Sequence, residues 1–157
     1  SPLSDYQDLM RVWQKMESHV KKGTVRQIGI SNCYDIKLFQ NIFQDAEIPP
    51  SVLQNRFYKK SGYDVNLRKF CHDKGIVYQS FWTLSANPDL LKHPVLSKIS
   101  IERGKTTAQI LFRYLTQVFV APLTGTKSPL HMQEDLDIFQ FELSTEEIHK
   151  IDQLCIA

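Results

Sequence analysis

The sequence lacks the features that mark membrane, secreted and nucleic-acid-binding proteins. Its unbroken apolar runs are only a few residues long, so no segment is long enough to span a bilayer. The N-terminus shows no succession of charged, apolar and small residues, so no signal peptide is visible. The net charge is only +2, from 19 basic and 17 acidic residues spread along the chain. We therefore expect neither nucleic acid nor a membrane as a partner.

Cysteine and metal-binding patterns are also scarce. The three cysteines, Cys33, Cys71 and Cys155, are odd in number and share no CxxC spacing. This usage predicts reduced core thiols and a cytoplasmic location. The 5 histidines have no HxH or HExxH spacing, so we expect no metal site. The chain begins with Ser1 rather than Met, which predicts that further sequence preceded it.

What the sequence contains is a regular alternation of two kinds of apolar pattern. Of its 157 residues, 42% are hydrophobic, enough for one buried core, so we expect residues 1–157 to form a single domain. Apolar residues at helical spacing alternate with short β-branched runs. They predict helices that include residues 9–20, 36–46, 67–71, 95–102, 107–117 and 130–136, a last helix opening at a capping box of Ser144 and Glu147, and strands over 25–30, 51–54, 76–80 and 118–123.

Local signals add detail to these elements. The first helix is predicted to turn Val12 and Trp13 inward. Asn32 or Asp35 is suited to cap the second helix. Residues 81–93 are predicted to form a long loop.

Repeated strand–helix alternation predicts parallel strands joined by right-handed crossovers. The pattern gives four strand–helix units preceded by one helix. A closed eight-stranded barrel usually needs about 250 residues, far more than this chain has. A flavodoxin-like sheet of four or five strands fits the length, but no GxGxxG motif follows the first predicted strand.

Polar and aromatic residues follow the predicted strands, where ligands of parallel α/β proteins gather. The amides of Asn32 and Gln54 suit a planar carboxamide. Phe81 or Trp82 offers a flat face on which a ring can stack. The hydroxyls, glycine and lysine of residues 124–128 precede a helix and suit phosphate. A nicotinamide dinucleotide has all three parts: carboxamide, aromatic ring and phosphates.

Six segments, in order along nearly the whole chain, carry a family resemblance: GTVRQIGISN, VLQNRFY, GIVYQSFWTLSANP, TTAQILFRYL, PLTGTKSPLHMQEDL and FQFELSTEEI. In these segments the chain resembles the C-terminal half of an aldo-keto reductase. Members of that family are NADP(H)-dependent (β/α)8 barrels that reduce aldehydes and ketones. The resemblance implies an α/β fold that is half of such a TIM barrel, with about four parallel strands and flanking helices.

Matched motif by motif, the resemblance implies that Ser31, Asn32 and Gln54 hold the nicotinamide carboxamide. It implies that Phe81 stacks on the nicotinamide ring, where the family commonly has a tyrosine. Structural alternatives stand beside each role: Ser31 and Asn32 can form a helix cap, Gln54 can be a satisfied core amide, and Phe81 and Trp82 can be packing residues.

The resemblance also implies a grip on the rest of the cofactor. Leu84 and Ser85 fall in the loop that binds the pyrophosphate. The loop and helix after the fourth strand are implied to hold the adenosine part, with Thr126, Lys127 and His131 around the 2′-phosphate and Glu134 and Asp135 near the adenine. His131 replaces the arginine of the family, which leaves NAD(H) as an alternative to NADP(H) as cofactor.

The catalytic tetrad of the family, an Asp, a Tyr, a Lys and a His, lies on the first four barrel strands, and nothing in this chain resembles those strands. We therefore name no catalytic residue and expect a cofactor-binding half that is inactive alone. The alternative is a non-catalytic binding or scaffold protein, because half a barrel exposes sheet edges and apolar surface. Such a protein would self-associate, or dock on a partner that covers the open half barrel.

Overall fold

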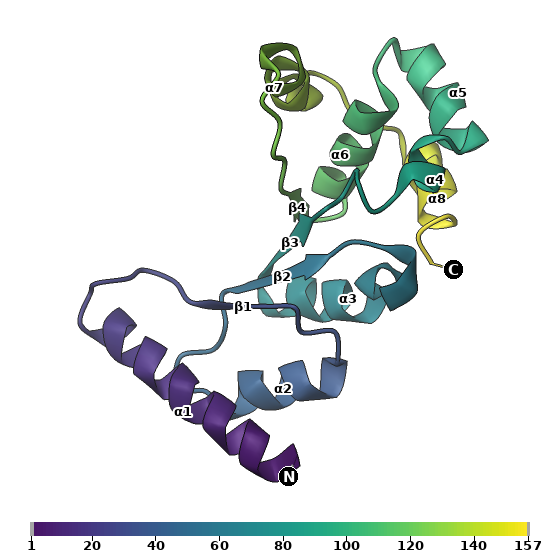
Figure 1. The fold of residues 1–157 in the computed structure, drawn as a ribbon. Helices are drawn as coiled ribbons and strands as arrows, with labels where there is room; N and C mark the ends of the chain where they lie inside the picture. The colour runs from purple at the N-terminus through teal and green to yellow at the C-terminus, as the bar shows by residue number, and fades with distance from the viewer. Residues whose placement is uncertain (1, 157) are drawn as a thin grey trace.

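The computed structural model describes residues 2–156, in which helices and strands alternate as the sequence predicts (Figure 1). Four strands are separated by helices, and a long helix precedes the first strand. The elements are α1 (Pro2–Lys21), β1 (Gly29–Ser31), α2 (Ile36–Asp45), β2 (Val52–Arg56), the 3-10 helix η1 (Lys59–Asp64), α3 (Val65–Lys74), β3 (Val77–Phe81), α4 (Pro88–Leu91), α5 (Pro94–Arg103), α6 (Thr107–Gln117), β4 (Val120–Pro122), α7 (Pro129–Leu136), the 3-10 helix η2 (Asp137–Gln140) and α8 (Thr145–Asp152).

The strands form one parallel sheet in the order β1-β2-β3-β4, which is also their order along the chain. Ser31 lies opposite Gln54, Gln54 opposite Gln79, and Gln79 opposite Ala121. Side chains at these positions therefore share one face of the sheet. The expectation of about four parallel strands with flanking helices is confirmed.

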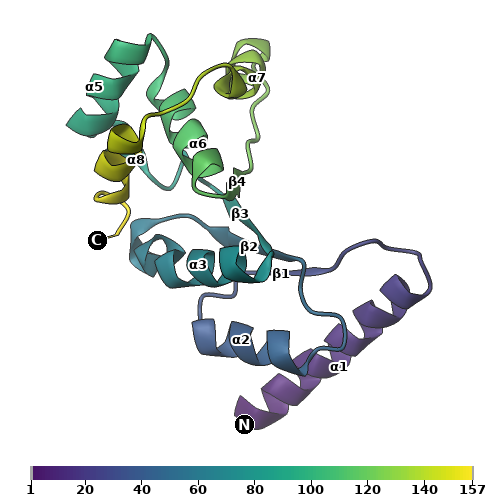
Figure 2. The same ribbon diagram turned by 180° about the vertical axis from the view of Figure 1, so that it is seen from behind.

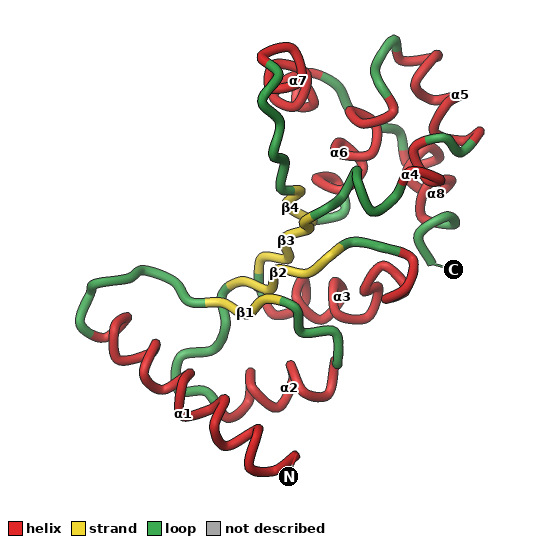
Figure 3. Tube along the Cα trace, in the orientation of Figure 1, coloured by secondary structure: helices red, strands yellow, loops and turns green. Residues whose placement is uncertain are grey.

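The helices cover one face of this sheet and leave the other open. Figure 3 shows the strands running through the molecule as a narrow band, and Figures 1 and 2 show α2, α3 and α6 following one another along the same side of it. The burial of β2 alternates accordingly, because Leu53 and Asn55 are fully buried whereas Gln54 and Arg56 are only half-buried.

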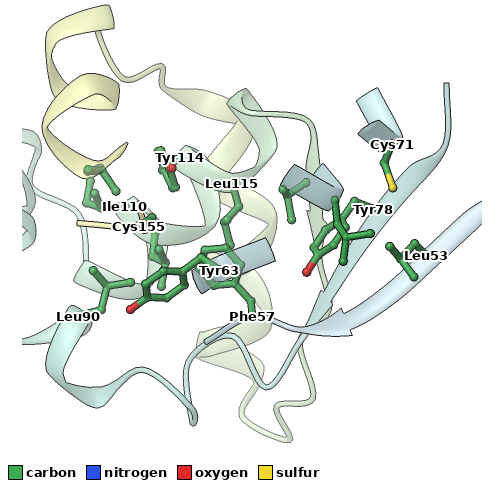
Figure 4. Packing of buried hydrophobic residues seen from close by; sticks show 14 of the residues in the cluster. Leu53, Phe57, Tyr63, Cys71, Tyr78, Leu90, Ile110, Tyr114, Leu115 and Cys155 are labelled. Carbon is green, nitrogen blue, oxygen red and sulfur yellow. The ribbon is translucent and has the colours of Figure 1, made fainter. Parts of the chain in front are cut away.

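The hydrophobic core lies between the sheet and these helices. Figure 4 shows Leu53 and Tyr78, from neighbouring strands, beside Cys71 of α3. Further along the same cluster, the rings of Phe57 and Tyr63 lie 4.9 Å apart, centroid to centroid. Burying large apolar side chains of this kind contributes about 1.5–3 kcal/mol each.

The three cysteines are buried and free, as predicted. Burial, which disfavours the thiolate, raises the pKa of Cys33 and of Cys155 to about 11 and that of Cys71 to about 12. These thiols are core residues in which burial disfavours the reactive thiolate. Among the helices of residues 2–156, none is long and apolar enough to cross a membrane.

Several details of the predicted elements are wrong. The second strand runs to Arg56 rather than ending at residue 54, and the fourth strand is Val120–Pro122 rather than 118–123. The first strand begins at Gly29 rather than at residue 25, because pairing with β2 would there meet Pro49 and Pro50, which have no N–H to donate. Residues 81–93 are not a continuous loop, since α4 forms within them. Val12 is 62% exposed, because α1 docks through a narrower stripe that contains the buried Trp13.

Candidate functional site

The carboxyl ends of the four strands meet at one rim of the sheet, since all strands are parallel. Ser31 ends β1, Arg56 ends β2 and Phe81 ends β3. The side chains of Ser31, Gln54 and Phe81 lie on the open face, since Ser31 pairs with Gln54 and Phe81 follows Gln79 by two residues. The structure thus brings these three predicted residues to the same face of three adjacent strands.

Two residues directly after the strands adopt a left-handed backbone conformation. Asn32 follows β1 with φ 58°, and Trp82 follows β3 with φ 54°. Asparagine tolerates this conformation, whereas for a bulky residue it is a genuine outlier. The turn at Asn32 is fixed by a backbone hydrogen bond from its N–H to the carbonyl of Gln54, 3.0 Å. Strain of this kind concentrates at functional sites and is held by the surrounding structure.

The amides at the rim have hydrogen-bonding capacity to spare. Asn32 Nδ2 donates to Ser31 Oγ at 3.3 Å, and Asn32 Oδ1 accepts from the Tyr34 hydroxyl at 3.2 Å. Gln54 Nε2 donates to Gln79 Oε1 at 2.9 Å. A carboxamide has two N–H donors and an oxygen with two lone pairs, so each amide keeps one donor and at least one acceptor site for a ligand.

The structure decides between the two predicted caps of α2. Asp35 is the N-cap, because its Oδ1 accepts from the N–H groups of Lys37, at 2.8 Å, and Leu38, at 3.2 Å. Asn32 lies three residues before that cap and makes neither bond. The interpretation of Ser31 and Asn32 as a helix cap is therefore wrong.

A cavity of about 370 Å³ lies between the loops that follow β3 and β4. It brings together Leu84 and Ser85 from the first loop with Thr126 from the second, three residues that the sequence predicts as phosphate-binding. Trp82 lines the same cavity and separates it from the end of β2. The cavity therefore begins at Trp82, the residue that follows Phe81 at the end of β3.

The loop after β4 leads into α7 through local hydrogen bonds. Thr126 Oγ1 accepts from the Ser128 N–H at 3.1 Å, and Ser128 Oγ accepts from the His131 N–H at 3.4 Å and caps the helix. The Lys127 and His131 side chains are exposed and do not line the cavity of about 370 Å³. They present positive or ionisable groups at the start of α7, where the helix dipole favours an anion.

The two acidic residues of this segment lie on α7. Glu134 and Asp135 are half-buried. Asp135 Oδ2 accepts a hydrogen bond of 2.8 Å from the Thr124 hydroxyl, which ties α7 to the loop after β4. Asp135 also lines a second, apolar cavity of about 540 Å³ beside β4.

Sequence reasoning missed a buried polar network behind the rim. Asn55 Nδ2 donates to Asp64 Oδ2 at 2.8 Å and to the Cys33 carbonyl at 2.7 Å. The Tyr78 hydroxyl donates to the same Asp64 oxygen at 2.7 Å, and burial together with this carboxylate raises the pKa of Tyr78. The network joins the turn after β1 to β2, β3 and η1. The network therefore holds the turn after β1 in place from the buried face of the sheet.

Sequence reasoning also missed Arg56 on the open face at the end of β2. Its Cζ lies 4.2 Å from the centroid of the Trp82 ring and 5.2 Å from that of Tyr58. The available signal was the strand periodicity, since Arg56 follows Gln54 by two residues and must share its face.

No group of three or more histidine, cysteine or acidic residues suited to a metal ion occurs among the described residues. The chemistry of the rim is that of amides, aromatic rings, hydroxyls and cationic side chains. This set suits an aromatic carboxamide joined to anionic groups.

Comparison with known proteins finds one family model and a set of reductase sequences that match nearly the whole chain. The model of the Aldo/keto reductase family matches residues 3–87 and 84–156. The 7-acetyl-epi-neemfruitin B aldo-keto reductase of Melia azedarach is 35% identical over 156 residues, which cover 94% of this chain and 47% of that protein. The glyoxal reductase of Bacillus subtilis (strain 168) is 33% identical over 142 residues, covering 90% and 50%. The chain spans about half the length of the curated relatives it matches.

Solved structures show the same relation in three dimensions. An aldo/keto reductase from Brucella melitensis superposes with a TM-score of 0.83 at 23% identity, over 95% of this chain and 56% of that chain. The aldose reductase of Schistosoma japonicum superposes with a TM-score of 0.75 at 29% identity, over 90% and 46%. The four parallel strands and their helices therefore form about half of a TIM barrel, as the sequence predicts.

Proposed function

Because this chain belongs to the aldo/keto reductase family, we propose that it binds a nicotinamide dinucleotide and forms the cofactor-binding half of a carbonyl reductase. The carrying observation is the rim itself, where Ser31, Gln54 and Phe81 share one face beside the cavity lined by Ser85 and Thr126. NADP(H) is the proposed cofactor, with NAD(H) as the alternative.

The nicotinamide would be held at the ends of β1, β2 and β3. Asn32 and Gln54 each keep a free amide donor and an acceptor site, which complement the donor and acceptor of a carboxamide. Phe81, half-buried on the same face, offers its ring for stacking. Ser31 supports Asn32 by accepting its amide hydrogen bond.

The phosphates would be held between the loops after β3 and β4. Ser85 and Thr126 line the cavity with hydroxyl groups, and Leu84 closes it with an apolar side chain. Lys127 and His131 would meet the 2′-phosphate at the start of α7, and Glu134 and Asp135 would lie near the adenine. Lys127 would supply the charge that favours NADP(H).

The bound dinucleotide would supply hydride to the carbon of an aldehyde or ketone. The residues of this chain would position the ring and exclude water at the strand ends. We assign no proton donor to this chain and propose that it does not reduce carbonyl compounds alone. Aldehydes and ketones are the proposed substrate class of the whole protein, in keeping with relatives that include a glyoxal reductase. The free buried thiols suit the proposed cytoplasmic location.

Titration of NADPH and NADH into the purified chain tests the cofactor proposal. Saturable binding is expected, with quenching of the exposed Trp82 by the nicotinamide. Asn32→Ala and Gln54→Ala each remove amide hydrogen bonds, so each should weaken binding by about tenfold. Gln14→Ala removes an exposed amide on α1 and should leave binding unchanged. Absence of saturable binding of either nucleotide would reject the proposal.

Self-association is a second candidate function, favoured by the open strand edges. Within residues 2–156, β1 pairs only with β2 and β4 only with β3. Beside β4, an apolar cavity of about 540 Å³ is bordered by Met132, Leu136 and Phe139, which are 47%, 68% and 66% exposed. A barrel of this type closes with eight strands, and this chain has four in its described residues. A second copy of the chain would supply the other four strands. Free edges and apolar patches of this kind favour association.

A further inference from the structure

Arg56 is a charged side chain on the open face of the sheet, at the carboxyl end of β2. It shares this face with Gln54 and lies opposite Phe81 in the pairing of β2 with β3. A charge that is removed from water needs a partner, and Arg56 is half-buried. Within residues 5–156, the ion pairs with N–O distances up to 4.0 Å do not include Arg56.

Aromatic rings hold the Arg56 guanidinium in place. Its Cζ lies over the Trp82 ring at 4.2 Å and over the Tyr58 ring at 5.2 Å, measured to the centroids. Contacts of this kind use the flat face of a guanidinium and leave its N–H edge for hydrogen bonds. The Nε atom is buried and has no acceptor in the described part of the chain. The guanidinium is therefore held against two rings and has an unpaired donor at Nε.

The surroundings of Arg56 favour an anion. The segment that follows β2 carries Lys59 and Lys60 and has no acidic residue before Asp64. Asp64 accepts hydrogen bonds within the buried network behind the sheet, and Asp35 caps α2. Both carboxylates are thus engaged elsewhere.

We propose that Arg56 is a specificity-determining residue that binds the carboxylate of an oxo-acid substrate through the N–H edge of its guanidinium. The inference rests on the proposed function, because Gln54 and Phe81, on the same face, are proposed to hold the nicotinamide. A carboxylate matches the planar fork of arginine with two parallel hydrogen bonds. The proposed phosphate loops lie on the β4 side of Trp82, whereas Arg56 lies on β2.

The test is a titration of the isotope-labelled chain, followed by NMR at the Arg56 Nε–H and the Trp82 indole N–H. The probes are para-acetylbenzoate, a ketone with a carboxylate, and its methyl ester, which keeps the ketone and loses the charge. We expect the acid to shift both signals and the ester to shift neither.

Three variants distinguish binding by the Arg56 guanidinium from an effect of positive charge in general. Arg56→Gln should weaken binding of para-acetylbenzoate by at least about tenfold. Arg56→Lys keeps the charge without the fork and should weaken it less. Arg26→Gln removes the same charge from an exposed residue ahead of β1 and should leave binding unchanged. Thermal melting of each variant confirms that it is folded.

The inference is overturned if Arg56→Gln binds the acid as tightly as the unmodified chain, or if the ester binds equally well. It is also overturned if inorganic pyrophosphate binds at Arg56 more tightly than the acid, because Arg56 would then serve a phosphate. A parallel titration with NADPH measures cofactor binding and so tests the proposed function separately. Binding of NADPH without binding of the acid rejects this inference alone. Binding of the acid without binding of NADPH rejects the cofactor proposal, and with it the role of the acid as a substrate.

Discussion

At the scale of single residues, the rim depends on one buried carboxylate. Asp64 is 5% exposed and accepts hydrogen bonds from Asn55 and Tyr78. Asp64→Ala leaves both donors without an acceptor in a water-free place, so it should lower the free energy of unfolding by about 2–4 kcal/mol. Urea denaturation measures this loss.

The matched control for Asp64 is an exposed aspartate. Asp73 forms an exposed ion pair with Lys69 at 2.9 Å, and Asp73→Ala should change the free energy of unfolding by less than about 0.5 kcal/mol. Equal losses in the two variants would show that the buried network does not stabilise the fold.

Glu147 gives the fold a dependence on pH. Hydrogen bonds from Arg103, at 2.9 and 2.5 Å, outweigh the effect of desolvation and lower the pKa of Glu147 from 4.5 to about 2. A depressed pKa means that this contribution is complete above about pH 4.5 and is lost as the pH falls towards 2. The melting temperature should therefore fall over this interval.

Glu147→Gln isolates the ion pair, because glutamine can still complete the capping box with Ser144. The variant should lose about 1 kcal/mol of stability at pH 7 and less at pH 2. Melting curves at both pH values provide the measurement. A loss of equal size at both would contradict the assignment to Arg103.

Residue patterns predicted part of the rim and missed part of it. Ser31 and Phe81 could be placed at strand ends because each follows a predicted strand. Gln54 was predicted to end its strand, but it lies two residues before the end of β2. The partner of Asp64 could not be predicted, since η1 brings it beside Tyr78 through left-handed backbone at Tyr63 and Asp64. The aromatic contacts of Arg56 depend on tertiary packing in the same way.

At the scale of elements, the pairing of β1 with β2 requires a glycine. A Cβ at Gly29 would lie 2.5 Å from the Val52 carbonyl oxygen and 2.8 Å from its Cβ. Gly29→Ala should force the strands apart, cost about 1–3 kcal/mol of stability and weaken NADPH binding by displacing Ser31 and Asn32. Denaturation and nucleotide titration measure the two effects.

Gly125 is the matched control for this substitution. A Cβ there would meet nothing within 4 Å, so Gly125→Ala should leave stability unchanged or slightly higher. If Gly29→Ala changed the free energy of unfolding as little as Gly125→Ala, the close approach of β1 and β2 would not require a glycine.

The elements themselves followed from local chemistry where that chemistry is strong. Residues 107–117 were predicted as a helix and form α6, and the capping box of Ser144 and Glu147 opens α8 as expected. The short α4 escaped prediction, because four residues are too few to show a periodicity. The start of β1 depended on the two prolines ahead of β2, and the pattern of one strand alone does not show which residues it will meet.

At the scale of the whole molecule, the open edges predict self-association. The chain should form dimers by light scattering, because pairing of strand edges and burial of the apolar surface beside β4 both favour contact with a second copy. Leu136→Glu and Phe139→Glu place charges on this surface and should yield monomers.

Ile101→Glu is the control for charge alone. Ile101 is 81% exposed on α5, away from the cavity beside β4, and its substitution should leave the dimer intact. A monomeric unmodified chain would exclude this mode of association.

The half-barrel architecture could be predicted only through resemblance. Alternation of strands and helices indicates a parallel sheet but fits a flavodoxin-like sheet as well as part of a barrel. Six segments along nearly the whole chain decided the matter by likeness to a known family, and the superpositions agree with it. Periodicity alone carries no information on curvature, which arises from packing between layers.

The strand order also has a consequence for how the chain folds. Each strand from β2 onward pairs with the strand that precedes it along the chain, across a crossover that contains at least one helix. Parallel pairing of this kind joins residues far apart in the sequence, such as Gly29 with Val52 and Tyr78 with Val120, and therefore slows folding. During synthesis, the first strand pair can form once residue 56 has left the ribosome, and each later strand can add to a template already made.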